Sequence, residues 1–111
     1  MNHLEGKVAS QGTASAKAFV TNNPLEKPSF EDYILVTQNS DPEISPLLYK
    51  SKGIITEVGG LMSHLAVISR EIKIPCITAC EGCYKELKTG YPIKINALSK
   101  LNSRAKIEYD Y

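Results

Sequence analysis

The stretch GIITEVGGLMSHLAVISREIKIP, residues 53–75, contains in order the parts of a strand, a glycine turn and a helix. Its apolar and β-branched start predicts a buried strand over residues 53–57. The pair Gly59-Gly60 then interrupts the pattern, and apolar residues of helical period follow over residues 63–72. The helix is expected to end at Lys73-Ile74-Pro75, because the residue before a proline avoids helical angles. A strand, turn and helix unit of this kind is typical of mixed α/β domains.

The rest of the chain supplies more strands than helices. Further strands are predicted at residues 6–10, 14–21, 33–37, 76–79, 91–96 and 106–109. A loop is predicted at 22–29, a short helix from Ser45-Pro46 to about residue 50, and one helical turn at 83–88. We therefore expect an α/β fold, in which residues 1–111 form one compact domain with short helices packed on a strand-rich core.

Composition and charge are those of an ordinary globular protein. The 111 residues are 42% hydrophobic and 23% charged, and 13 basic and 12 acidic side chains give a net charge of +1. No block of like charge stands out, so binding to nucleic acid or to a membrane surface is not expected. Neither a signal peptide nor a membrane span is expected, because no apolar run is long enough. Three cysteines between residues 76 and 83 do not form a disulfide framework and predict a reducing, cytoplasmic compartment.

His64 is the candidate functional residue, because it lies in the first turn of the predicted helix. Gly59 and Gly60 let the main chain approach a ligand closely, and Ser63 is placed to cap the helix. The unpaired N–H groups and the positive dipole end of the first turn form an anion site. An imidazole with an ordinary pKa of about 6.5 is partly unprotonated near neutral pH and suits a phosphoryl acceptor. The same local pattern also fits a histidine that only caps the helix or covers its surface.

Helical periodicity separates the other polar residues of this segment from His64. Glu71 falls nearly on the same line but about 10 Å away, too far to orient the imidazole directly. Arg70 lies about 120° around the helix and is expected in a structural ion pair or a partner-docking contact. Thr56, before the glycine loop, faces either the phosphate or the packing at the strand end. Thr56, Arg70 and Glu71 are therefore candidate supporting residues. The apolar stripe expected to pack on the sheet consists of Leu65, Ile68 and Ile72.

Cys76, Cys80 and Cys83 have the C-x3-C-x2-C spacing associated with radical S-adenosylmethionine iron–sulfur sites. That superfamily needs a large barrel, which 111 residues do not build. Cys76 also falls in a predicted core strand, where a free cysteine behaves as a small hydrophobe. We therefore expect no metal site, and the three cysteines remain weak candidates for one.

Residues 53–75 closely resemble the mobile phosphohistidine domain of phosphoenolpyruvate-utilising enzymes. That family includes phosphoenolpyruvate synthase, pyruvate phosphate dikinase, enzyme I of the sugar phosphotransferase system and rifampin phosphotransferase. The shared motif consists here of Gly59-Gly60, Ser63-His64, Ala66, Arg70-Glu71 and Ile74-Pro75, in the family's order. The resemblance is strongest over residues 33–77, and residues 97–111 are divergent. It implies a swivelling β/β/α domain in which His64 is phosphorylated, with Gly59, Gly60 and Ser63 supporting the phosphate.

The chain also departs from the family pattern. Met62 stands where the dikinases usually have a threonine, and methionine neither binds phosphate nor serves as a regulatory target. Residues 96–103 replace a glycine-containing hairpin, so the resemblance does not secure the last strand. The family's ATP-grasp domain and phosphoenolpyruvate-binding barrel are absent from the 111 residues. This chain alone is therefore not expected to bind ATP or pyruvate in the family's way.

The resemblance implies a phosphocarrier that passes a phosphoryl group on His64 between a phosphoenolpyruvate or ATP site and an acceptor site. It would be a phosphotransferase component that lacks the nucleotide- and phosphoenolpyruvate-binding domains. Its expected partner is a protein or domain that binds ATP, phosphoenolpyruvate or pyruvate. No cofactor is expected on the chain itself, and Mg²⁺ is expected only in the partner sites. Two alternatives remain open: a non-catalytic regulatory or assembly module that keeps the fold and, more remotely, a cysteine-based metal or iron–sulfur site.

Overall fold

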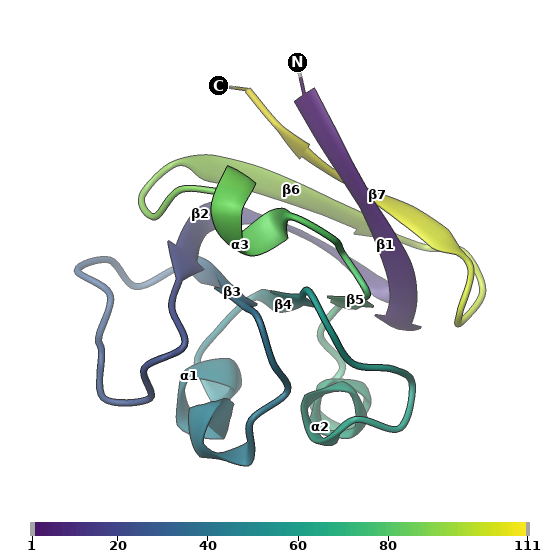
Figure 1. The fold of residues 1–111 in the computed structure, drawn as a ribbon, viewed down its shortest axis with the longest axis horizontal. Helices are drawn as coiled ribbons and strands as arrows, with labels where there is room; N and C mark the ends of the chain where they lie inside the picture. Colours follow the sequence, from purple (N-terminus) through teal and green to yellow (C-terminus); the bar gives the residue numbers. More distant parts are fainter. Residues whose placement is uncertain (1, 111) are drawn as a thin grey trace.

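The strands of the computed structural model, which describes residues 2–110, form one closed barrel (Figure 1). Residues 1 and 111, which the predicted domain includes, lie outside the described residues. The elements in chain order are β1 (Asn2–Ser10), β2 (Gly12–Val20), β3 (Tyr33–Thr37), η1 (Pro42–Ile44), α1 (Ser45–Tyr49), β4 (Gly53–Thr56), α2 (His64–Ile72), β5 (Cys76–Thr78), α3 (Cys83–Glu86), β6 (Pro92–Ala97) and β7 (Arg104–Tyr109). Around the barrel the strand order is β1-β5-β4-β3-β2-β6-β7. The predicted α/β class is confirmed.

The barrel has a parallel half and an antiparallel half. Strands β2, β3, β4 and β5 pair in parallel, whereas β1, β6 and β7 pair antiparallel with their neighbours. Helices α1 and α2 lie against β3, β4 and β5, and α3 lies on the opposite side of these strands (Figure 1). Strands β3, β4 and β5 are buried along their whole length, as expected for parallel strands covered on both faces. In β6 and β7, buried and more exposed residues alternate, because one face meets water.

Alternate residues of the central strands enter two separate cores. Ile34 and Val36 of β3 join the core inside the barrel, whereas Tyr33 and Leu35 join the core beneath the helices. The barrel core is filled mainly by Val8, Ile34, Val36, Ile55, Ile77, Ile93, Ile95 and Ile107. The helix-side core contains Phe19, Tyr33, Leu35, Ile44, Leu48, Ile54 and Leu65. Helix α2 is thereby fixed on the outer face of the parallel strands.

The apolar face predicted for α2 is confirmed for two of its three residues. Leu65 is buried and Ile68 packs against the helix-side core, but Ile72 belongs to neither core. Ala66 and Ser69 are the other buried residues of the helix. Small side chains at these two positions let the helix lie close to the sheet.

No helix among residues 2–110 has the length and apolar character needed to cross a bilayer.

The divergent segment before the last strand closes without a glycine. Asn102 takes the left-handed conformation, with φ 69°, and its N–H donates to the Val8 carbonyl at 2.7 Å. The Val8 N–H in turn donates to the Ser103 carbonyl at 2.9 Å. Strand β7 then pairs with β1 from Lys7↔Arg104 to Asn2↔Tyr109. This pairing explains why both strands begin earlier than their residue patterns predict.

Candidate functional site

The glycine loop joins β4 to α2 at the carboxyl ends of the parallel strands. Hydrogen bonds continue past the strand ends, because the N–H groups of Glu57 and Val58 donate to the carbonyls of Thr37 and Gln38 at 3.2 Å and 3.0 Å. The loop therefore lies beside the segment that follows β3. In open α/β sheets the carboxyl ends of the strands are where ligands bind, and this edge carries the predicted site residues.

The two glycines of the loop have different structural requirements. Gly59 has φ +135°, a conformation that residues with a side chain rarely adopt. A Cβ at Gly60 would meet no atom within 4 Å, so nothing in the resting protein demands glycine there. Both residues are exposed. The loop thus presents bare main chain to the surroundings, as an anion-binding loop must.

Helix α2 is capped from another segment. Ser63 is the N-cap residue of α2, as predicted, but its side chain makes no capping hydrogen bond. Its hydroxyl donates instead to the Gly60 carbonyl at 2.8 Å. The Ser40 hydroxyl instead accepts a hydrogen bond from the Leu65 N–H at 3.0 Å. Sequence reasoning missed Ser40, because it lies 25 residues before Leu65 and no local motif marks it. Ser63 supports the loop and Ser40 supports the helix.

His64 is exposed at the first position of α2. Its imidazole makes no hydrogen bond with the other residues described. The N–H groups of His64 and Ala66 also lack a hydrogen-bond acceptor within residues 2–110. Donors that are unpaired at the positive end of a helix attract an anion, and an exposed imidazole stands beside them. The geometry thus suits a nucleophile that receives an anionic group.

Arg70 links the glycine loop to strand β1 through hydrogen bonds to main-chain carbonyls. Its Nη1 donates to the Ala9 carbonyl at 2.6 Å, and its Nη2 donates to the Leu61 carbonyl at 2.5 Å. The guanidinium therefore bonds main-chain carbonyls of β1 and the loop, in place of the predicted ion pair, and the partner-docking role stays a prediction. A partly buried arginine with its planar fork suits two acceptors at once. Arg70 is a supporting residue through the loop and not through direct contact with His64.

Replacing Arg70 with lysine is expected to lower the free energy of unfolding by about 1–3 kcal/mol, since a hydrogen bond from a charged group contributes roughly that much and lysine lacks the fork. Amide exchange in residues 59–62 should become faster. Urea denaturation and hydrogen exchange measure these effects. The control is Arg104→Lys at an exposed position of β7. Equal stability of both variants would show that Arg70 does not brace the loop.

The other two candidate supporting residues have contrasting positions. Glu71 is exposed, and its side chain makes no hydrogen bond or ion pair with another described residue. Thr56 is buried at the end of β4, beneath Gly59. The structure therefore places Thr56 close to the glycine loop and leaves Glu71 on the solvent side of α2.

The three cysteines are divided between the two cores. Cys76 lies in the helix-side core, whereas Cys80 and Cys83 lie together in the barrel core. All three are free and buried. The hydrogen bond with the Cys80 thiol, together with burial, raises the pKa of Cys83 far above its ordinary value. The spacing in sequence therefore does not become a cluster in space, and the described residues contain no group of three or more metal-ligating side chains suited to a metal ion.

Cys76 is expected to make the fold sensitive to alkaline pH. Burial raises its pKa from 9.0 to about 12, so the unfolded chain loses this proton first and stability falls as pH rises above 9. Between pH 8 and pH 10, the buried Cys76 thiol should lower the free energy of unfolding by about 1.4 kcal/mol. Urea unfolding at both pH values measures the drop in the free energy of unfolding between pH 8 and pH 10. This drop should be smaller by about that amount in Cys76→Ala than in the parent. An identical fall in both proteins would contradict the buried thiol as its source.

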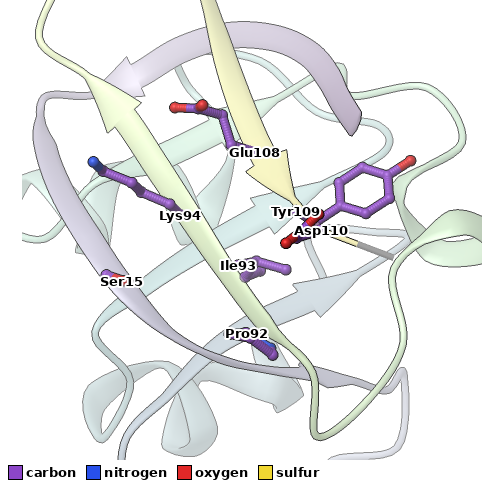
Figure 2. Close-up of a pocket in the computed structure, with 7 residues that line it drawn as sticks. All are labelled: Ser15, Pro92, Ile93, Lys94, Glu108, Tyr109 and Asp110. Atoms are coloured by element: carbon purple, nitrogen blue, oxygen red, sulfur yellow. The ribbon is translucent and has the colours of Figure 1, made fainter. Parts of the chain in front are cut away.

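Two grooves on the surface of the described residues lie apart from His64. A groove of about 230 Å³ lies beside β6 and β7. It is lined by Ser15, Pro92, Ile93, Lys94, Glu108, Tyr109 and Asp110 (Figure 2). A second groove of about 410 Å³ lies around Phe30, Tyr33 and Leu47. Neither is lined by the glycine loop or by α2. The candidate site is therefore an exposed loop and helix end, with Val58 54% and Met62 83% exposed beside it.

Residues 30–100 match the family described as "PEP-utilising enzyme, mobile domain". The chain is 41% identical over 94 residues to rifampicin phosphotransferase of Bacillus subtilis, covering 84% of this chain and 11% of that protein. It is 35% identical over 94 residues to phosphoenolpyruvate synthase of Helicobacter pylori, covering 84% of this chain and 12% of that protein. The chain thus corresponds to about one-ninth of the length of these relatives.

Two solved structures share the fold. The NMR structure of enzyme I has a TM-score of 0.58 and 20% identity, over 72% of this chain and 31% of that one. Aconitase X of Thermococcus kodakaraensis has a TM-score of 0.65 and 16% identity, over 100% of both chains. The structural likenesses show the fold, and the matched sequence carries the Gly59, Gly60, Ser63 and His64 site. The chain belongs to the family of PEP-utilising enzyme mobile domains.

Proposed function

We propose that this chain is a phosphocarrier whose His64 imidazole accepts a phosphoryl group at one site and delivers it to another. The observation that carries the proposal is the exposed imidazole in the first turn of α2, beside the unpaired N–H groups of His64 and Ala66. A carrier must present its reactive group to two different sites, and an exposed loop and helix end allow that access. A histidine inside a closed cavity would not.

The proposed transfer needs no chemistry beyond a displacement at phosphorus. One imidazole nitrogen attacks the phosphorus of the donor, a nitrogen–phosphorus bond forms, and the donor's phosphorus–oxygen bond breaks with its electron pair on oxygen. The proton on the other ring nitrogen is released as the ring regains neutrality. The helix N–H groups and the glycine loop stabilise the phosphoryl oxygens. In the second step, an acceptor oxygen displaces the imidazole in the same way.

The donor and acceptor sites are proposed to lie on partner proteins or domains. The named relatives are about nine times longer than the part that matches this chain, and their names indicate phosphotransfer and phosphoenolpyruvate synthesis. We propose phosphoenolpyruvate or ATP as the donor, with Mg²⁺ bound in the partner sites and no cofactor on this chain. The free, buried cysteines support a reducing, cytoplasmic compartment.

The test is transfer from labelled donors. The protein is incubated with cell extract and either phosphoenolpyruvate or ATP that carries ³²P in the transferable group. The expected label is stable in alkali, lost in acid, and located on His64 and not on His3 by peptide mass spectrometry. Absence of label with both donors would contradict the carrier function. A stable partner complex that needs no His64 would then favour the regulatory or assembly module.

A further inference from the structure

Thr56 has a buried hydroxyl that nothing in the resting protein explains. Its Oγ1 has no hydrogen-bond partner within the described residues, and the residue is 1% exposed. It is the sole side-chain oxygen or nitrogen of residues 2–110 in this situation. Burial of an unpaired hydroxyl costs stability, so buried polar groups are nearly always paired. A threonine kept at this cost needs a partner in another state of the protein.

The hydroxyl of Thr56 faces the glycine loop of the candidate site. Its Oγ1 lies 3.6 Å from the point where a Cβ on Gly59 would stand, and Ser63 Oγ lies 3.5 Å from the same point. Two hydroxyls thus flank the space that Gly59 leaves empty. Ser63 is already engaged with the Gly60 carbonyl, whereas Thr56 is not. The main chain of Gly59 and Gly60 beside this space is exposed.

A threonine hydroxyl at the end of a parallel strand can find a hydrogen-bond partner, as Thr37 in the neighbouring strand shows. Thr37 stands next to Thr56 in the parallel register of β3 and β4, and it is 2% exposed. Its hydroxyl donates to Asn22 Oδ1 at 2.8 Å. Two threonines at equivalent places in adjacent strands therefore differ in one respect, and the unpaired one lies under the loop that precedes His64.

We propose that the Thr56 hydroxyl is a phosphate-binding group that becomes paired only when His64 is phosphorylated. The glycine loop shifts, the hydroxyl is uncovered, and it donates a hydrogen bond to a phosphoryl oxygen. Glycine at 59 and open space around Gly60 make this shift sterically easy. The N–H groups of α2 hold the phosphoryl group from the helix side and Thr56 holds it from the strand side. This inference rests on the proposed function.

The experiment loads the protein directly, without a partner. Phosphoramidate is the probe: a His64 nitrogen attacks its phosphorus, the phosphorus–nitrogen bond breaks, and the departing nitrogen takes up a proton and leaves as ammonia. The half-life of phosphohistidine is then followed by ³¹P NMR, and thermal unfolding of the unloaded proteins is measured. The variants are Thr56→Val, which keeps the shape and removes the hydroxyl, Thr56→Ser, which keeps the hydroxyl, and Thr37→Val as the matched control.

We expect the half-life to fall about tenfold in Thr56→Val, the size of effect of losing one hydrogen bond to a charged oxygen. Thr56→Ser and Thr37→Val should retain the parent half-life. Before loading, Thr56→Val should unfold at the parent temperature or above it, whereas Thr37→Val should unfold below it, because only Thr37 loses an existing bond.

Each other result decides against a specific claim. A parent-like half-life in Thr56→Val overturns the inference and leaves the carrier function intact. A lower unfolding temperature in Thr56→Val shows that the hydroxyl is already paired, which also overturns the inference. Failure of the parent protein to load at His64 contradicts the proposed function, and with it this inference.

Discussion

Replacing His64 with alanine is expected to abolish phosphoryl acceptance from every donor while leaving the fold intact. The side chain is exposed and makes no hydrogen bond with the other described residues, so its loss should change the free energy of unfolding by less than about 0.5 kcal/mol. The loss of function should be complete, because the chain's other histidine, His3, lies on β1 and not at the start of α2.

His3 provides a matched control for this substitution. The chain has two histidines, and His3 is also exposed, on β1, where it pairs with Glu108 across the strands. His3→Ala should accept the label as the parent does, whereas His64→Ala should remain unlabelled at any time or donor concentration. Circular dichroism and urea denaturation of both variants check the fold. Label retained in His64→Ala would place the acceptor on another residue and reject the phosphocarrier as described.

The sequence was sufficient for the features that depend on neighbouring residues. The apolar runs at 33–37 and 53–57 predict strands, and strands β3 (Tyr33–Thr37) and β4 (Gly53–Thr56) are there, buried along their whole length. The glycine pair and the helical period after it place His64 at a helix start, which is where it lies. In each example the residues that determine the element are close neighbours in sequence, so backbone preference and side-chain period are enough to predict it.

Features that depend on distant segments could not be predicted in this way. The period of α2 gave the direction of Arg70 but not its partners, since Ala9 lies 61 residues away. Ser40 caps α2 only because parallel pairing of β3 and β4 brings their following segments together. The hairpin before β7 was hard to predict because Asn102 adopts a left-handed conformation that glycine more often signals. Closure of the barrel likewise depends on β1 pairing with both β5 and β7.

Gly6→Ala is expected to cause the largest loss of stability among single substitutions of the chain's glycines. A Cβ at Gly6 would stand 2.4 Å from Cγ2 of Ile77 and 2.7 Å from the carbonyl oxygen of Thr78. The second contact is with main chain of β5, which cannot turn aside as a flexible side chain can. Strand β1 pairs with β5 and β7 at this level, so any shift opens the barrel. Overpacking of this kind should cost about 3 kcal/mol, the upper end of the usual range, because main chain blocks the added methyl group.

Gly60→Ala is the matched control, because a Cβ there would meet nothing within 4 Å. Urea denaturation should give a free energy of unfolding within about 1 kcal/mol of the parent for Gly60→Ala and a much lower one for Gly6→Ala. Because Ala9 of the same strand β1 accepts the hydrogen bond from Arg70, displacement of β1 should also loosen the loop at Leu61. Faster amide exchange in residues 59–62 of Gly6→Ala would show that barrel closure and the His64 loop share one support. Unchanged exchange there, with the barrel destabilised, would show that the two are independent.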